Sequence, residues 1–208
     1  LVTDIVVPTA LAVPLIWLFA SKLRQLAIAH RELAEFAATD SHTKVMSRAA
    51  FSTLVEAFLE DAGKRRADAS GALLIVDADE FKSINDRFGH EIGDRVLRHV
   101  AVVLRDAMRG DSVLARYGGE EFCAMVPVSD PAEAEAVAER VRDAVQARPF
   151  LLAGGSIDVT VSIGLACHRP GLTLREVLRT ADSRVYFAKA SGRNKVVSEY
   201  PVLEEAIV

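Results

Sequence analysis

The sequence Arg116-Tyr117-Gly118-Gly119-Glu120-Glu121-Phe122 lies between two short apolar segments, residues 112–115 and 123–126. Two apolar segments separated by a pair of glycines are typical of a β-hairpin with Gly-Gly in its turn. Glycine has no Cβ, so a phosphate or a ribose can approach this backbone closely. Two carboxylates beside such a turn can hold a divalent cation through their oxygens. A hairpin without chemistry explains these seven residues equally well, so the rest of the chain has to decide.

The composition indicates one domain of ordinary size with an appendage. The chain has 208 residues, half of them hydrophobic, and a net charge of -4. There is no basic excess, so we do not expect a polynucleotide partner. The two cysteines, Cys123 and Cys167, lie in apolar segments and are predicted to be buried and reduced, without a disulfide framework or a cysteine metal site.

The N-terminus carries an uncharged segment, residues 5–20, followed directly by Lys22 and Arg24. Trp17 lies near the end of this segment, and an aromatic residue followed by basic ones is the order expected where a membrane helix enters the cytoplasm. We therefore expect residues 1–21 to be the end of a transmembrane helix in the inner (cytoplasmic) membrane, with the rest of the chain in the cytoplasm. A buried helix is the alternative, since the segment is shorter than the roughly 20 residues a span requires. The first residue is Leu1, so we expect the chain to begin partway through a longer protein.

Residues 22–39 have a helical pattern in which the residues of one seam recur at spacings of three and four. These residues are Leu23, Leu26, His30, Leu33 and Ala37. The spacing predicts a short coiled coil that would join two copies of the chain. An amphipathic connector that packs on its own domain is the alternative.

From residue 40 to residue 200 the pattern alternates between strands and helices, and residues 201–208 form a tail. We expect helices over residues 48–61, 94–108, 131–146 and 173–190. We expect strands over residues 72–76, the hairpin, 158–166 and 195–197. The order strand–helix–strand–strand–helix–strand predicts an α/β (α+β) domain with a ferredoxin-like mixed sheet flanked by helices, preceded by a helical extension.

Carboxylates are predicted at two neighbouring strand ends. Asp77 and Asp79 follow the apolar segment 72–76, and the Glu120-Glu121 pair follows the hairpin turn. Two metal ions on such groups are a known solution for phosphoryl transfer. A loop carboxylate that caps the next helix would explain one aspartate but not the gathering of acids at both ends.

Polar residues that suit a nucleotide follow the same strand. Lys82 could reach a phosphate, and Asn85, His90 and Asp94 lie around a short turn where Asn and Asp can read a guanine edge. The alternatives are a solvated lysine and an Asp94 that caps a helix.

Two cations near the C-terminus form another candidate. Lys189 and Arg193 are four residues apart, a helical spacing that would let both bind phosphate. The alternative is an ordinary helix C-terminus with Gly192 as its cap.

Together these segments resemble the GGDEF family of diguanylate cyclases over about residues 40–198. The matching stretches are DADEFKSIND (77–86), FGH (88–90), GD (93–94), ARYGGEEF (115–122), TVSIG (160–164), AD (181–182), YFAK (186–189) and GRN (192–194). The resemblance implies a five-stranded sheet related to nucleotidyl cyclases and polymerase palms. It also implies condensation of two GTP into cyclic di-GMP and two pyrophosphates, with two Mg²⁺ (or Mn²⁺) ions per active site, in an antiparallel homodimer.

The resemblance also assigns roles by position. As metal ligands it implies Asp77, the Ala78 carbonyl, Glu120 and Glu121, with Glu120 also the general base toward the ribose 3′-hydroxyl. Lys82 would stabilise charge on the phosphates during catalysis. The nucleotide-binding positions would be Asn85, His90, Asp94, Gly118, Gly119, Lys189 and Arg193, with Asn85 and Asp94 on guanine.

The sequence departs from the family pattern at two informative places. The family often has an inhibitory Arg-x-x-Asp motif before the hairpin, whereas here Arg109 is followed by Ser112 at the aspartate position. We therefore expect weak or absent product inhibition. The start of the domain usually reads Asp-x-Leu-Thr-Gly, and here His42 and Lys44 replace the leucine and the glycine. The coupling between helix and domain is therefore expected to differ.

Two other functions remain open. A domain that has lost catalysis would bind GTP or cyclic di-GMP and signal through a partner, and a related cyclase would make a different or mixed dinucleotide. The intact hairpin carboxylates favour an active enzyme, and Asp94 favours GTP on both sides.

Overall fold

The computed structural model describes residues 15–25, 38–65, 71–108, 110–169 and 171–199. It divides into two units, residues 1–38 and 39–208. In the first unit residues 15–25 are helical and expose Trp17 and Phe19 to solvent. None of the described helices is both long and apolar enough to cross a membrane. Most of the predicted coiled-coil positions, from Leu26 to Ala37, lie outside the described residues.

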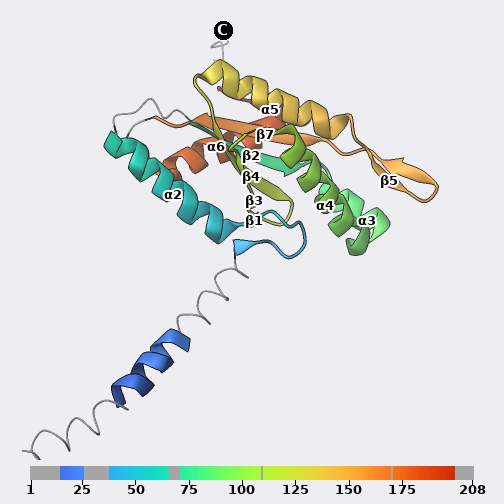
Figure 1. Ribbon diagram of the computed structural model, residues 1–208. Coiled ribbons are helices and arrows are strands. Elements are labelled where there is room, and N and C mark those ends of the chain that lie inside the picture. The colour runs from blue at the N-terminus through green and yellow to red at the C-terminus, as the bar shows by residue number, and fades with distance from the viewer. Residues whose placement is uncertain (1–14, 26–37, 66–70, 109, 170, 200–208) are drawn as a thin grey trace, which may run out of the picture. The chain divides into compact units, whose positions relative to one another are not determined.

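The second unit is built on a six-stranded sheet (Figure 1). Its strands, in spatial order, are β1 (Met46–Ser47), β3 (Val113–Arg116), β4 (Glu121–Pro127), β2 (Gly71–Ala78), β7 (Val161–Cys167) and β8 (Val196–Val197). The four central strands are antiparallel to one another, and the edge pairs β1–β3 and β7–β8 are parallel. The central order β3-β4-β2-β7 is that of a ferredoxin-like fold, which confirms the predicted architecture. The resemblance implied five strands, and the sheet has six because both two-residue edge strands, β1 and β8, are counted.

Helices cover both faces of this sheet. They are α2 (Arg48–Arg65), α3 (Phe81–Phe88), α4 (His90–Ala107), α5 (Pro131–Gln146) and α6 (Leu174–Ala190). Strand β2 is buried along its whole length because its side chains alternate between two cores. Leu73 and Ile75 pack with residues of α2 and α6, whereas Leu74 and Val76 pack with residues of α4 and α5. The site described below lies at the carboxyl end of β2, on the α2 and α6 face.

Helix α6 is held very close to the sheet by Gly164 of β7. A Cβ built on this glycine would lie 2.0 Å from the backbone oxygen of Ala181 and 2.6 Å from the backbone nitrogen of Val185. Such distances are far below van der Waals contact, so only glycine permits this approach. The helix begins at a capping box between Thr173 and Glu176 and ends beside the carboxyl end of β2. Local sequence therefore determines where α6 begins and ends, and Gly164 determines how closely α6 packs on the sheet.

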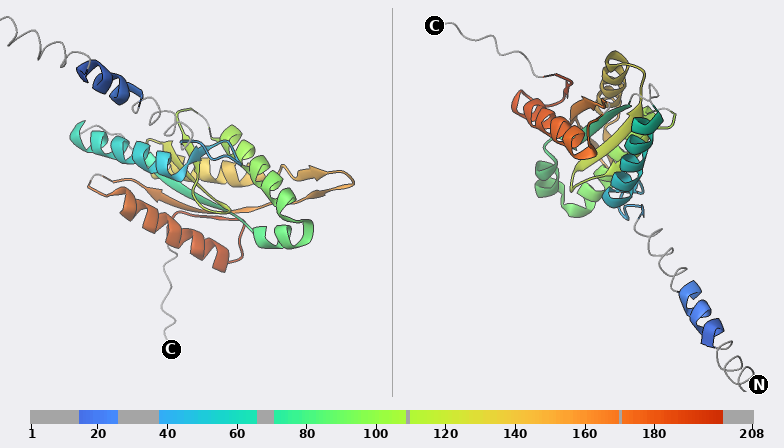
Figure 2. Two further views of the ribbon diagram at one scale, coloured as in Figure 1. Left: turned by 90° about the horizontal axis from the view of Figure 1, so that it is seen from below. Right: turned by 90° about the vertical axis from the view of Figure 1, so that its left-hand side faces the viewer.

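Several local features differ from the sequence expectations. The helix expected at 94–108 begins at His90, because Gly89, with φ 82°, separates α4 from the preceding α3. Asp94 therefore lies inside α4 and does not cap it. Helix α3 and the two-stranded hairpin of β5 (Phe150–Leu152) and β6 (Gly155–Ile157) were not expected, and Figure 2 shows this hairpin projecting from the body of the domain.

A cavity of about 790 Å³ lies at the other end of β2 and β7, lined by Gly71, Cys167 and His168 among others. None of the predicted site residues lines it. Cys123 is buried, Cys167 is partly exposed, and both are free thiols, as the sequence led us to expect apart from the partial exposure.

Candidate active site

The end of β2 and the start of β4 bring the predicted acidic residues side by side. In the antiparallel register Asp77 lies opposite Glu121 on one side and Ser162 on the other. The Ala78 N–H donates a hydrogen bond of 3.2 Å to the backbone carbonyl of Glu120. Residues 77–78 and 120–121, which are 43 positions apart in the chain, therefore meet at one edge of the sheet.

The Asp77 carboxylate is buried and only partly satisfied. Its residue is 2% exposed, and Oδ2 is 2.6 Å from Nζ of Lys189 at the end of α6. Its Oδ1 has no hydrogen-bond partner among the described residues. Burial is the main cause that raises the pKa of Asp77 to about 6; the charge and hydrogen bond of Lys189 oppose the rise, and the carboxylates of Glu120 and Glu121 add to it. A buried carboxylate with an unused oxygen is an environment in which a cation would be stabilised.

The donor set at this edge fits a divalent cation, although it is small. In the described part of the chain there is no group of three or more His, Cys, Asp or Glu side chains close enough to hold a metal ion. The predicted ligands are the Ala78 carbonyl and the carboxylates of Asp77, Glu120 and Glu121, and these three side chains do not form such a group in the structure. Hard cations such as Mg²⁺ accept this kind of oxygen set and keep several waters. The unused Oδ1 of Asp77 is the observation that supports the fit.

The hairpin turn is shaped by hydrogen bonds and by one close contact. The N–H groups of Tyr117 and Gly118 both donate to the Glu121 carbonyl, at 2.8 and 3.1 Å. Neither Gly118 nor Gly119 adopts a positive φ, so the turn does not use the left-handed conformation that glycine permits. A Cβ at position 118 would lie 2.4 Å from Glu121 Oε2, so a larger residue there would displace the end of this side chain. At 119 a Cβ would meet no heavy atom of the described residues within 4 Å, so that position is open for a ligand.

The residues expected to read guanine lie on two adjacent helices. Asn85 is on α3 and Asp94 on α4, and the amide oxygen of Asn85 packs against Gly93, where a Cβ would lie only 1.9 Å away. The structure thus brings Asn85 next to the residue that precedes Asp94. Lys82 and His90 are both exposed, on α3 and at the first residue of α4.

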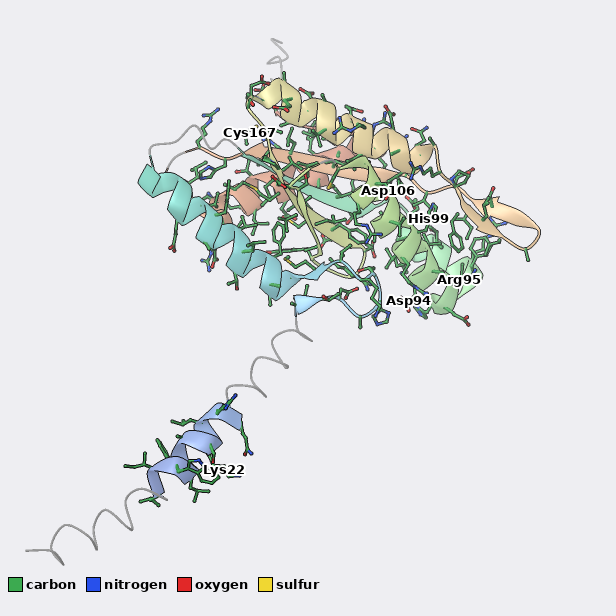
Figure 3. The ribbon with its side chains drawn as sticks, in the orientation of Figure 1. Lys22, Asp94, Arg95, His99, Asp106 and Cys167 are labelled. Atoms are coloured by element: carbon green, nitrogen blue, oxygen red, sulfur yellow. The ribbon has the colours of Figure 1, made fainter. Side chains whose placement is uncertain are left out.

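The turn at Asp40–Lys44 contacts both of these regions. Asp40 Oδ1 is 3.4 Å from the Arg116 guanidinium, which also donates two hydrogen bonds to the Gly119 carbonyl. His42 Nδ1 is 3.3 Å from Asp94 Oδ2, and Figure 3 shows Asp94 close to this turn. Sequence reasoning did not find either contact, because the partners are far apart in the chain.

Asp40 is held as a carboxylate by its neighbours. Burial by itself would raise the pKa of Asp40, but hydrogen bonds from Thr43 and the charge of Arg116 outweigh burial and hold the pKa below its ordinary value. The ion pair between Asp40 and Arg116, both mostly buried, therefore links the turn to the hairpin.

The two C-terminal cations are not related as the sequence suggested. Lys189 is on α6, but the helix ends at Ala190 with Ser191 as its C-cap, so Arg193 is not on the helix and does not share a face with Lys189. Arg193 lies in a loop with φ 56°, and its Nε is 3.0 Å from Glu80 Oε1. Both cations nevertheless lie beside the segment that follows β2, Lys189 at Asp77 and Arg193 at Glu80.

Asp79, the second acid of the strand end, is not directed at the hairpin carboxylates. Its two oxygens accept hydrogen bonds from the hydroxyls of Ser162 and Thr160 and from the backbone N–H of Asn194. The sequence placed it beside Asp77 but could not show partners that lie 81 to 115 positions away.

Comparisons with known proteins identify the family of the domain. The family described as "Diguanylate cyclase, GGDEF domain" matches residues 37–195. Diguanylate cyclase A of Treponema denticola is 36% identical over 180 residues, which are 85% of this chain and 48% of that protein. The response regulator PleD of Caulobacter vibrioides is 41% identical over 171 residues, 79% of this chain and 37% of PleD. The chain thus spans about half or less of the length of these relatives.

Solved structures show the same fold. The coiled coil and GGDEF domain of DgcB from Caulobacter crescentus, in complex with c-di-GMP, superimposes with a TM-score of 0.76 at 28% identity, covering 91% of this chain and all of that one. The GGDEF domain of YfiN (TpbB) from Pseudomonas aeruginosa gives 0.70 at 32% identity, covering 76% and 99%. Because the family match covers most of the chain, residues 37–195, this chain belongs to the GGDEF family of diguanylate cyclase domains.

Proposed function

We propose that this chain is a diguanylate cyclase that condenses two GTP into cyclic di-GMP and two pyrophosphates. The observation that carries the proposal is the junction of β2 with the hairpin. There a buried Asp77, with one unused oxygen, lies opposite Glu121 and next to the Glu120 backbone. Membership of the family and the relatives named as diguanylate cyclases support the same activity.

In the proposed reaction each ribose 3′-hydroxyl attacks the α-phosphorus of the other GTP, and pyrophosphate leaves with the electron pair of the broken P–O bond. Glu120 accepts the proton of the hydroxyl. Mg²⁺ or Mn²⁺ ions, two per site and held by Asp77, the Ala78 carbonyl, Glu120 and Glu121, would lower the pKa of that hydroxyl and neutralise the triphosphate. Lys82 stabilises the charge that develops on the phosphates.

The remaining site residues bind and orient the nucleotide. Asn85 and Asp94 hydrogen-bond the guanine edge, and His90 binds the nucleotide beside them. The backbone at Gly118 and Gly119 allows the ribose and the α-phosphate to approach. Lys189 and Arg193 bind the outer phosphates. Both cations are paired with acids in the structure, Lys189 with Asp77 and Arg193 with Glu80, so nucleotide binding requires both to exchange partners.

The product requires two sites that face each other, so the proposal includes an antiparallel homodimer. One site holds one GTP, and the two must approach with the attacking and leaving groups in line. We propose that residues 22–39 set the placement of the two domains, residues 40–200, as a coiled coil. If deletion of residues 22–39 left activity unchanged at every protein concentration, this role would be wrong.

The proposal also includes attachment to the inner membrane. The uncharged residues 5–20 followed by Lys22 and Arg24 support a membrane helix end over residues 1–21, with the catalytic domain in the cytoplasm. Fractionation of cells that produce this protein tests the attachment, since recovery in the cytosolic fraction would contradict it.

Incubation with GTP and Mg²⁺, with Glu120→Gln as the control, tests the catalytic proposal. We expect cyclic di-GMP and two equivalents of pyrophosphate from the wild-type chain, and at least a hundredfold less from the variant, because the general base and a metal ligand are lost together. Nucleotide binding without product would indicate a catalytically inactive signalling module. A different cyclic dinucleotide from mixed nucleotides would indicate the related cyclase.

A further inference from the structure

Asp79 is a buried carboxylate with every oxygen engaged, and it takes no part in the proposed chemistry. Its residue is 5% exposed. Oδ1 accepts from the Ser162 hydroxyl at 2.7 Å, and Oδ2 accepts from the Thr160 hydroxyl at 2.8 Å and from the Asn194 backbone N–H at 3.0 Å. A buried charge is tolerated only when it is hydrogen-bonded in this way, so the arrangement is specific.

The loop that Asp79 binds has an unusual backbone. Gly192, Arg193 and Asn194 have φ values of 109°, 56° and 46°, which are three consecutive residues in the left-handed region. For a residue with a Cβ this conformation costs roughly 1–2 kcal/mol. Two such residues in sequence need support from outside the loop. A hydrogen bond from a backbone N–H to a buried carboxylate is charge-assisted and among the stronger ones available.

The loop carries Arg193, and its guanidinium is free to change partners. The pair between Arg193 and Glu80 is half exposed on both sides, and such a surface pair contributes about 0–1 kcal/mol. The hydrogen bond from the Asn194 N–H to Asp79 is more buried than the Arg193–Glu80 pair, because Asp79 is only 5% exposed. The Arg193 guanidinium can therefore leave Glu80 and bind a phosphate while the backbone of the loop stays in place.

We propose that Asp79 is a positioning residue that fixes the loop at residues 192–194 so that Arg193 points at the phosphates of the bound nucleotide. The proposal rests on the proposed function, since the ligand is taken to be a guanosine triphosphate. The two aspartates of the strand end then have separate tasks: Asp77 faces the cation, and Asp79 acts through the Asn194 N–H on the residue that binds phosphate.

A double-mutant cycle tests this with a ligand that cannot react. Affinity for 3′-deoxy-GTP, which lacks the attacking hydroxyl, is measured in Mg²⁺ for the wild type, Asp79→Ala, Arg193→Ala and the double variant. We expect about a tenfold weaker affinity for each single variant, and a double variant no weaker than Arg193→Ala alone, because both remove the same contact. Asp79→Asn keeps an acceptor for the Asn194 N–H and should recover most of the affinity. Guanosine, which has no phosphates, should bind all variants equally.

Several results would overturn the proposal. These are losses that add in the double variant, unchanged affinity in Asp79→Ala, or an equal loss for guanosine. Unchanged affinity in Arg193→Ala would instead refute the phosphate contact itself, and this inference with it. A chain that binds 3′-deoxy-GTP with the expected cycle but makes no cyclic di-GMP would refute only the catalytic proposal.

A measurement on the unaltered protein keeps the test decisive if Asp79→Ala fails to fold. Amide hydrogen exchange should show the Asn194 N–H protected at least tenfold relative to an unstructured amide, because it is bonded to a buried carboxylate. An unprotected Asn194 amide would contradict the proposal whatever the variants do.

Discussion

The substitution Gly93→Ala should separate guanine recognition from folding. A Cβ at this position of α4 would lie 1.9 Å from Asn85 Oδ1 and 3.2 Å from Phe81 Cζ. An ordinary contact begins near 3.4 Å, so the Asn85 amide must retreat by about 1.5 Å, whereas Phe81 need give only a few tenths of an ångström. Asn85 is only partly buried, so its side chain can swing toward solvent without opening the core.

The magnitudes predict opposite effects on binding and on stability. One or two hydrogen bonds to guanine would be lost at about 0.5–1.5 kcal/mol each, which corresponds to an increase of roughly 2- to 160-fold in KM for GTP. Alanine in place of glycine inside a helix contributes about 0.5–1 kcal/mol to stability. The small displacement of Phe81 offsets part of that gain, so Tm should stay the same or rise.

Pyrophosphate release at varied GTP, together with thermal unfolding, provides the assay. Gly155→Ala is the matched control, because a Cβ there meets no heavy atom of the described chain within 4 Å and the residue lies in the projecting hairpin. It should change neither quantity. A normal KM in Gly93→Ala, or a loss of activity that only follows a fall in Tm, would refute the placement of Asn85 at the guanine.

Three further substitutions test the fold and its regulation. Gly164→Ala places a Cβ 2.0 Å from the backbone oxygen of Ala181, which cannot move aside as a side chain would. We expect this overpacking to lower the free energy of unfolding by about 1–3 kcal/mol or more and Tm by several degrees. An unchanged Tm would contradict the contact. Asp40→Asn should lower Tm at neutral pH. The folded pKa of Asp40 lies below 3.8, so the stability that its carboxylate contributes is present above pH 3.8 and is lost as the pH falls through the folded pKa. The difference in Tm between wild type and variant should therefore disappear in acid. A difference that does not depend on pH would refute the ionic contribution. With Ser112 in place of the usual aspartate, cyclic di-GMP should bind weakly in a calorimetric titration, and tight binding abolished by Arg109→Ala would show that the inhibitory site is intact.

Long apolar patterns and explicit helix signals were sufficient to predict the body of the domain. The uninterrupted apolar residues of β2 predicted a strand buried on both faces. Pro131 predicted the first turn of α5, and of the two candidate caps, Ser129 and Asp130, the structure uses Asp130. The elements that sequence reasoning missed are short. Helix α3 has eight residues and is followed directly by a glycine, and β5 and β6 have three residues each, so none shows enough periods for a pattern to emerge.

The site was predictable only as far as its parts are local in the chain. Motif resemblance assigned roles to Asp77, Glu120 and Lys189, and the structure brings these segments to one sheet edge. The task of Asp79 depends on three partners from distant segments, and the contact between His42 and Asp94 depends on how the preceding turn folds back. Local pattern carries no information about such partners, because they are chosen by the tertiary packing.

The two thiols differ in a way that offers a built-in handle for spectroscopy. Burial raises the pKa of Cys123 far more than that of Cys167, so a maleimide dye at mildly alkaline pH should modify Cys167 alone, without prior removal of the other cysteine. Cys167 ends β7 at the edge opposite to the one that faces nucleotide, roughly 20 Å away by the rise of an extended strand. A fluorophore there can follow subunit association by energy transfer while it leaves the reacting groups untouched.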